Sequence, residues 1–248
     1  MMRRRLFLPL LSLALATAPG WAREPTRLAV LGFSEDGSAF AFEQFGWLNG
    51  ASAPYSELTI FATATGRPVG GSPFAASIVD GDAPQARARS MVYTAASRAL
   101  AQFQVGAPGT VAARASGDPN DPAAAQVGFE APGLGPLTLR LDIASVQAAG
   151  CEATGAKVKA LAIRLLDGKG TVLRTLYKEK NPPPDRQCPT GYAVTEVRLL
   201  PRTGKPPVLA VIVGMERPAH GGAERRYLGF TADLALPAAA EAADAGRE

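Results

Sequence analysis

Hydrophobic and polar residues alternate over several short stretches of the chain, and this period of two is typical of half-buried β-strands. Near the amino terminus the alternation covers residues 27–33, 38–43 and 57–62. Ser34, Asp36 and Gly37 separate the first two stretches and favour a reversal of the backbone. The pattern predicts an antiparallel meander of three strands within an amino-terminal β region over residues 23–81.

The second half of the chain repeats the pattern. Further strands are predicted at residues 126–130, 137–146, 157–166, 171–177, 194–200, 208–215 and 226–233. Residues 167–170 (DGKG) predict a tight hairpin, because glycine supplies the left-handed backbone that such turns need. Residues 208–213 (VLAVIV) are continuously apolar, which suits a central strand buried on both faces. Residues 106–236 are therefore expected to form a β-sandwich-like region, with an open barrel as the alternative.

One stretch has helical periodicity. Apolar residues recur every three or four positions at Ala88, Val92, Ala95, Ala99 and Phe103. Asp82 is expected to cap this helix and Pro84 to occupy its first turn, within residues 82–105. The small residues in the stripe favour packing on a sheet. The predicted fold class is thus mainly β: an antiparallel meander plus β-sandwich-like sheets, with one amphipathic α-helix.

The first 22 residues have the organisation of a signal peptide. Three arginines precede an apolar run, and small residues then offer cleavage after Ala22 or after Ala18. The adjacent arginines leave twin-arginine export open beside the general route. We expect a periplasmic or secreted protein with no transmembrane span after signal removal, because the run is too short to span a bilayer. Residues 237–248 are expected to be a disordered tail.

Export changes the charge balance. The chain has 26 basic and 22 acidic residues, but three of the basic ones lie in the signal peptide. The mature chain is therefore close to neutral, and no basic run remains that would bind nucleic acid.

Two cysteines, Cys151 and Cys188, lie in segments that are predicted to be loops. Two cysteines in an exported chain predict one disulfide. A loop of this size contributes roughly 4 kcal/mol to stability in the chain-entropy model. A reactive thiol or a metal site is disfavoured, since neither cysteine has a basic neighbour or a set of partner ligands in sequence.

Candidates for catalysis are few. His220 is the only histidine, so a His-dependent triad would have to use it and a His-rich zinc site is excluded. No phosphate loop or dinucleotide motif is present, and no cofactor, metal or catalytic residue is assigned. The alternative to a binding protein is a carboxylate-dependent hydrolase of envelope polysaccharide, for which Glu43 and Glu57 would have to converge in a cleft.

Aromatic residues gather in the segment 45–55, which contains Gly46 and Gly50 and is expected to be a loop. The simplest interpretation of these rings is a packed core. A contact surface is the alternative, because aromatic residues in a glycine-rich loop are hard to bury by the flanking strands alone. We therefore hypothesise a non-enzymatic binding or interaction module, with Trp47, Asn49 and Tyr55 contacting an envelope protein or glycan. A structural or assembly factor is a third possibility.

Two resemblances rest on the same segment. Residues 33–37 (FSEDG), with Ala41-Phe42, 58–60 (LTI) and Thr65-Gly66, resemble one blade of a TolB-type β-propeller, but no second copy follows. Residues 32–61 (GFSEDGSAFAFEQFGWLNGASAPYSELTIF) resemble the opening of an uncharacterised bacterial family of predicted secreted proteins, a domain of unknown function. The helix at 84–103 and the strands around 208–215 and 225–227 are similar to its later landmarks, whereas 219–223 diverge. This resemblance implies export and a mainly β fold, and it brings no activity.

Overall fold

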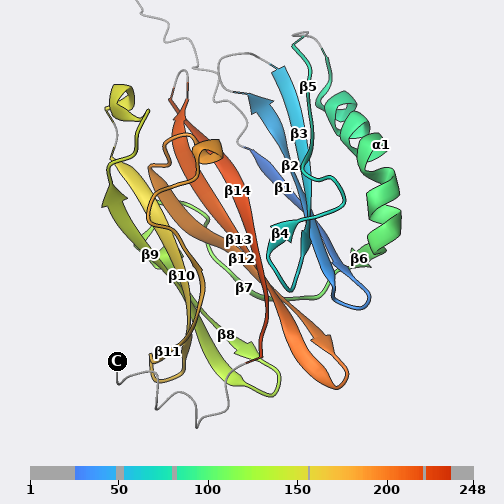
Figure 1. Ribbon diagram of the computed structural model, residues 1–248, viewed down its shortest axis with the longest axis vertical. Coiled ribbons are helices and arrows are strands. Elements are labelled where there is room, and N and C mark those ends of the chain that lie inside the picture. The colour runs from blue at the N-terminus through green and yellow to red at the C-terminus, as the bar shows by residue number, and fades with distance from the viewer. Residues whose placement is uncertain (1–25, 49–52, 80–82, 156, 220–221, 236–248) are drawn as a thin grey trace, which may run out of the picture.

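The structure, a computed structural model, describes residues 26–48, 53–79, 83–155, 157–219 and 222–235. The predicted signal peptide, the carboxyl-terminal tail, Asp82 and His220 lie outside these residues. In the described part of the chain, three antiparallel sheets are stacked side by side, and the single α-helix covers the outer face of the amino-terminal sheet (Figure 1). The predicted fold class is confirmed.

The three sheets are named A, B and C. Sheet A contains β1 (Arg27–Ser34), β2 (Ala39–Leu48), β3 (Ala53–Ala62), β4 (Arg67–Pro68), β5 (Phe74–Ser77) and β6 (Val105–Ala107). Sheet B contains β7 (Thr110–Arg114), β12 (Gly191–Arg202), β13 (Lys205–Ala219) and β14 (Gly222–Asp233). Sheet C contains β8 (Gln126–Ala131), β9 (Gly135–Val146), β10 (Val158–Asp167) and β11 (Val172–Lys178). The helix α1 spans Gln85–Phe103, and the short helices η1, η2 and η3 span Pro122–Ala125, Glu152–Thr154 and Pro184–Arg186.

The helix lies where its small residues face sheet A. Val92, Ala96 and Ala99 of α1 form a buried cluster with Leu58 and Ile60 of β3. Alanine on the buried face favours close packing on the sheet, as predicted, but the predicted stripe is wrong at Ala95, which is exposed while Ala96 is buried. Pro84, expected in the first turn, is the N-cap residue. The chain leaves α1 through Gln104 in a left-handed conformation (φ 48°).

Sheet B is buried on both faces. This burial explains why apolar and polar residues do not alternate in its strand β13. Leu209, Val211 and Val213 belong to the core between sheets B and C. Val208, Ala210 and Ile212 belong to the core between sheets A and B. All six are at most 1% exposed, so both faces of the strand select apolar residues. The prediction of a central strand at residues 208–213 is confirmed.

Phenylalanines fill the core between sheets A and B. Phe33, Phe40, Phe42 and Phe61 form this cluster, and the rings of Phe42 and Phe61 are stacked with centroids 5.8 Å apart. Gly229 of β14 lies directly against these two rings. Sheet A thus packs on sheet B through large aromatic side chains, and glycine at position 229 leaves room for two of them.

The amino-terminal meander is confirmed, but the loop predicted over residues 45–55 is wrong at both of its ends, where the described residues belong to strands. β2 continues to Leu48, and β3 begins at Ala53. Every residue from Ala39 to Leu48 has a cross-strand partner, the last being Ala53. The glycine at position 46 is accommodated in the strand, where its missing side chain leaves room for Thr26 and the Tyr55 ring.

Sheet A is also larger than the meander. The short strands β4, β5 and β6 extend it, and the sheet packs against a second sheet. The blade-like resemblance therefore covers only the β1–β2–β3 hairpins.

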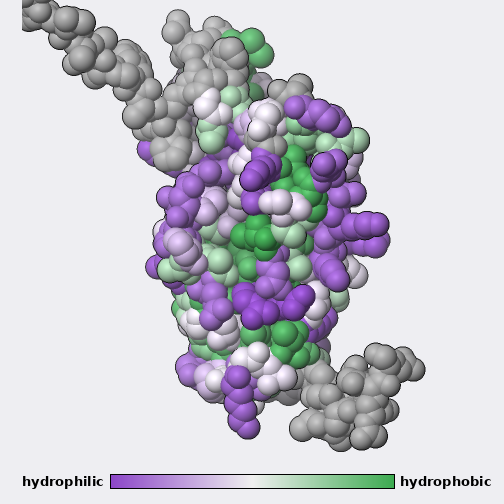
Figure 2. Space-filling model, turned by 90° about the vertical axis from the view of Figure 1, so that its left-hand side faces the viewer, coloured by the Kyte–Doolittle hydropathy of each residue, from purple (hydrophilic) through white to green (hydrophobic). Residues whose placement is uncertain are grey.

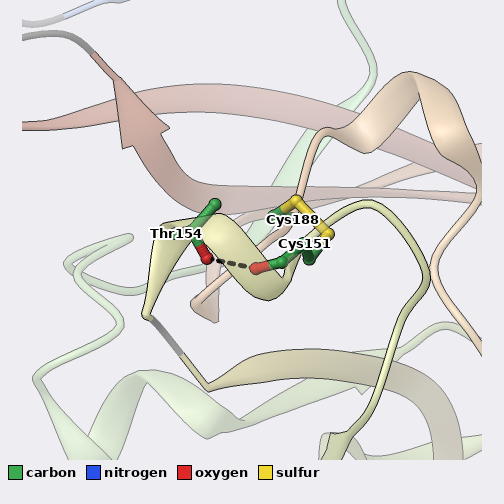
Figure 3. Close-up of a disulfide and its surroundings, with 3 residues drawn as sticks. All are labelled: Cys151, Thr154 and Cys188. Atoms are coloured by element: carbon green, nitrogen blue, oxygen red, sulfur yellow. Dashed lines mark hydrogen bonds between the residues drawn. A yellow bond between two sulfur atoms is a disulfide. The ribbon is translucent and has the colours of Figure 1, made fainter.

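The predicted disulfide is present. Cys151 and Cys188 are bonded at 2.02 Å across a sequence separation of 37. The bond joins the loop before β10 to the loop before β12, and Thr154 of η2 donates a hydrogen bond to the carbonyl oxygen of Cys151 at 2.8 Å (Figure 3).

Candidate functional site

The candidate site lies at the end of sheet A where β2 ends and β3 begins. A hollow of about 260 Å³ opens there beside the short strand β5. Its lining residues are Leu48, Tyr55, Ser56, Glu57, Ala75, Ala76, Ser77 and Arg226. β5 pairs with β3 over Tyr55–Leu58, so the hollow lies beside a short strand at the margin of sheet A.

Tyr55 forms a wall of this hollow but is itself buried. It is 3% exposed, and its hydroxyl donates a hydrogen bond to Oγ1 of Thr26 at 2.8 Å. The guanidinium of Arg226 lies 4.1 Å from the ring centroid, a cation–π distance. Burial raises the pKa of the Tyr55 phenol. The expectation that Tyr55 offers an exposed ring is therefore wrong, because Arg226 and Thr26 cover it.

Besides Glu57 of β3, the charges near the hollow come from the β13–β14 hairpin. Glu224 is 7% exposed, and its Oε1 lies 2.6 Å from Nε of Arg226. Its Oε2 lies 3.2 Å from Nη2 of Arg217. Glu216 lies 3.0 Å from Nη2 of Arg225. These five side chains form a charge ladder of ion pairs along the β13–β14 hairpin.

The sequence contains a signal for this ladder that the pattern of apolar and polar positions does not reveal. The dipeptide Glu-Arg stands on both sides of the hairpin turn, at 216–217 and at 224–225. In the antiparallel register Glu216 lies opposite Arg225 and Arg217 lies opposite Glu224. A repeated Glu-Arg pair around a turn therefore predicts two opposite-charge cross-strand pairs.

Trp47 and Tyr55 are not brought together. Trp47 lies opposite Pro54, whereas Tyr55 lies opposite Gly46. Neighbouring positions of a strand point to opposite faces, so Trp47 lies on the helix-facing side of sheet A and Tyr55 on the side that faces sheet B. Trp47 is half-buried, and Asn49 lies outside the described residues.

Glu43 is held in the interior by four hydrogen bonds. Arg89 of α1 donates to both of its carboxylate oxygens, at 2.8 and 2.7 Å. Ser56 donates to Oε1 at 2.8 Å, and Tyr93 donates to Oε2 at 3.1 Å. The Glu43 side chain has no exposed surface. Hydrogen bonds from Arg89 to this carboxylate raise the pKa of the guanidinium.

Glu57 lies in a separate environment. It accepts a hydrogen bond from Nε2 of Gln44 at 2.9 Å, and Gln44 also bonds to the backbone of Tyr227 on β14. Since Glu57 lies opposite Gln44 while Glu43 lies opposite Leu58, the two carboxylates point to opposite faces of sheet A. The convergence that the hydrolase hypothesis requires is therefore contradicted.

Two larger hollows, of about 540 and 520 Å³, flank the disulfide and share Ala148, Cys151 and Val158. The charged side chains near these hollows bond to one another inside the protein. Arg186 is 8% exposed and donates hydrogen bonds to Glu179 at 2.7 Å and to the Tyr177 hydroxyl at 2.9 Å. Burial raises the pKa of Tyr177 to about 12. This buried network anchors the loop that carries Cys188, and its polar groups are already satisfied.

No group of three or more His, Cys, Asp and Glu side chains that could hold a metal ion occurs among the described residues. No helix in the described part of the chain is long and apolar enough to cross a membrane.

Comparison with known proteins identifies a family. A family model described as "Predicted secreted protein (DUF2259)" matches residues 41–232. No curated protein and no solved structure matches the chain.

Proposed function

We propose, since this chain belongs to the DUF2259 family of predicted secreted proteins, that it is a non-enzymatic binding module of the cell envelope. Its contact surface is the end of sheet A formed by Trp47, the hollow and the strand β5. The partner is another envelope protein, one side chain of which enters the hollow.

The observation that carries the proposal is the size and lining of the hollow. Its volume of about 260 Å³ is below the usual range for small-molecule sites, which is roughly 300–1,000 Å³. It is large enough for one protein side chain, as in an interface that anchors a residue in a pocket. Leu48, Ala75 and Ala76 supply apolar walls, while Glu57 and Arg226 supply opposite charges at the same place.

The short strand beside the hollow supports a protein partner over a glycan. β5 has four residues, of which Ala75 and Ser77 are exposed. An exposed strand at a sheet margin offers backbone hydrogen bonds to an extended peptide, and neighbouring hollows then select its side chains. A polysaccharide site would instead favour an exposed ring for stacking, whereas Tyr55 is covered.

The proposal is tested by affinity capture of the mature protein from a periplasmic extract of its native host. Ser77→Arg places a long side chain at the hollow, and Trp47→Ala removes the half-buried ring. Each is expected to abolish capture of the same partner, identified by mass spectrometry, with the melting temperature little changed. The matched control is Arg98→Ala on the exposed face of α1, which should capture the partner normally.

Two results would overturn the proposal. One is normal capture by both Ser77→Arg and Trp47→Ala. The other is loss of capture in Arg98→Ala to the same extent, which would place the contact elsewhere.

A further inference from the structure

Strand β9 is longer than its neighbour on one side. It pairs with β10 along residues 137–146. Its pairing with β8 covers only residues 135–140, from Gly135 opposite Ala131 to Arg140 opposite Gln126. Beyond that point, no described strand pairs with the other edge of β9. The edge of residues 142–146 therefore presents unpaired backbone groups at the margin of sheet C.

The three central side chains of this edge, at 143–145, are exposed and uncharged. Ile143, Ala144 and Ser145 are all exposed, and Ile143 is one of the few large aliphatic residues in the described chain with more than a third of its surface accessible (36%). Figure 2 views the molecule from the side of sheet C, where apolar residues emerge between polar ones near the middle of the surface. By strand alternation Ile143 continues the row of Leu139 and Leu141, which are buried in the core against sheet B.

An edge of this composition is one that natural proteins usually protect with charge, proline or a bulge. We propose that residues 142–146 of β9 pair, antiparallel, with the same residues of a second copy of this chain. Two copies of sheet C then form one continuous sheet across a two-fold axis. This surface is separate from the hollow at β5, so the inference does not depend on the proposed function.

The sequence of this edge is complementary to itself. A two-fold axis at Ala144 places Ala144 opposite its copy and Ile143 opposite Ser145. The two Ile143 side chains are then diagonal neighbours on one face, within reach of each other. The charged residue of the segment, Asp142, lies opposite Val146. Its carboxylate already pairs with Arg140 at 3.0 Å and Arg164 at 2.8 Å. No like charges face each other in this arrangement.

The opposite margin of sheet C provides a contrast. β11 also has an exposed aliphatic residue, Val172, at 41%. The same strand carries Arg174 and Lys178, both exposed. Antiparallel self-pairing of β11 would bring these cations together, and like charges across a strand pair are destabilising. Charge therefore favours β9 over β11 as the self-pairing edge.

The first test is sedimentation equilibrium of the mature protein over a hundredfold range of concentration. The wild type is expected to show a reversible monomer–dimer equilibrium. Ile143→Lys should raise the dissociation constant roughly tenfold or more, because lysine on an edge opposes pairing. Val172→Lys is the matched control, since it adds the same charge to the other margin, and it should dimerise like the wild type.

A second test reads the register. Ala144→Cys places two thiols opposite each other at the two-fold axis, so mild oxidation should give a disulfide-linked dimer with high yield. Val172→Cys, also at an exposed position, should remain largely monomeric under the same conditions. The inference is overturned by a wild type that is monomeric throughout, by Ile143→Lys and Val172→Lys behaving alike, or by equal cross-linking of the two cysteine variants.

Discussion

Arg89 of α1 and Glu43 of β2 form a two-point ion pair inside the protein. Nε of Arg89 donates to Oε1 at 2.8 Å, and Nη2 donates to Oε2 at 2.7 Å. The guanidinium also lies 3.9 Å from the centroid of the Phe45 ring. The Arg89 side chain is about one-third exposed, whereas Glu43 has no exposed surface. The helix is therefore attached to sheet A by an ion pair between a buried carboxylate and one partly exposed arginine.

Replacing Arg89 by Ala is expected to destabilise the protein by about 3–5 kcal/mol, because it leaves an uncompensated charge in the interior. The measurement is the free energy of unfolding in urea. Arg98→Ala, at an exposed position of the same helix, should change it by no more than about 0.5 kcal/mol. The double variant Glu43→Met, Arg89→Met should lose less than Arg89→Ala alone, since both charges are removed together. Equal losses of unfolding free energy for Arg89→Ala and Arg98→Ala would show that the Arg89–Glu43 ion pair does not stabilise the fold.

The role of Glu43 marks a limit of reasoning from sequence. Residues 39–42 (AFAF) alternate small and large apolar residues rather than polar and apolar ones. Such a strand is buried on both faces, and the structure buries all four residues. Glu43 continues the row of small residues that faces α1, but the arginine that meets it is 46 positions away. The burial of Glu43 thus follows from the pattern. Its pairing with Arg89 does not, because that requires the position of the helix on the sheet to be known.

Other elements were likewise predictable only where their burial shows in the local sequence. The run at 208–213 predicted a central strand because burial on both faces leaves a local trace in composition. The short strands β4 to β7 left no such trace, since they have two to five residues and are positioned by the strands they pair with. The burial of Tyr55 depends on Arg226, which is 171 positions later in the chain, so residues 45–55 by themselves suggested an exposed loop.

Gly229 is expected to tolerate no side chain. A Cβ at this position would lie 2.7 Å from Cε1 of Phe42 and 2.8 Å from Cε2 of Phe61. Both rings are fixed in the core between sheets A and B, so Gly229→Ala should destabilise by about 1–3 kcal/mol through overpacking. The midpoint of thermal unfolding measures this loss.

Gly128→Ala in β8 is the matched control for that variant. A Cβ there meets a single atom, the Leu137 carbonyl oxygen, at 4.0 Å. Its stability should be equal to or slightly above that of the wild type, because alanine costs less backbone entropy than glycine in a strand. If both alanine variants melt at the same temperature, the packing of sheets A and B is looser than the contacts at Gly229 indicate.

Removing the disulfide should cost stability without abolishing the fold. The Cys151→Ser, Cys188→Ser variant opens a loop with a separation of 37 residues, for which the chain-entropy model gives a loss of about 4 kcal/mol. The buried bonds of Arg186 to Glu179 and Tyr177 still hold the second loop in place. Urea unfolding of wild type and variant, each with and without a reducing agent, measures the effect. Reduction should weaken the wild type to the level of the variant and leave the variant unchanged; a reduced wild type as stable as the oxidised form would contradict the prediction.

Asp36 in the β1–β2 turn should give the protein a specific loss of stability in acid. Ser34 Oγ and the backbone N–H of Ser38 donate to its Oδ1 at 2.7 and 2.9 Å, and these bonds lower the pKa of the carboxyl group from 3.8 to about 2. Because the folded pKa lies below the unfolded one, the carboxylate stabilises the fold above about pH 5, and this contribution is lost as the pH falls towards 2. Asp36→Ala should therefore be less stable than the wild type at neutral pH, by about 1 kcal/mol or less since the group is exposed, and the difference should shrink as the pH falls. Urea unfolding at a series of pH values tests this, with Glu35→Ala as the control for removing an exposed acidic side chain from the same turn. A difference between Asp36→Ala and wild type that stays constant from pH 6 to pH 2, or that Glu35→Ala reproduces, would show that these hydrogen bonds do not hold the turn.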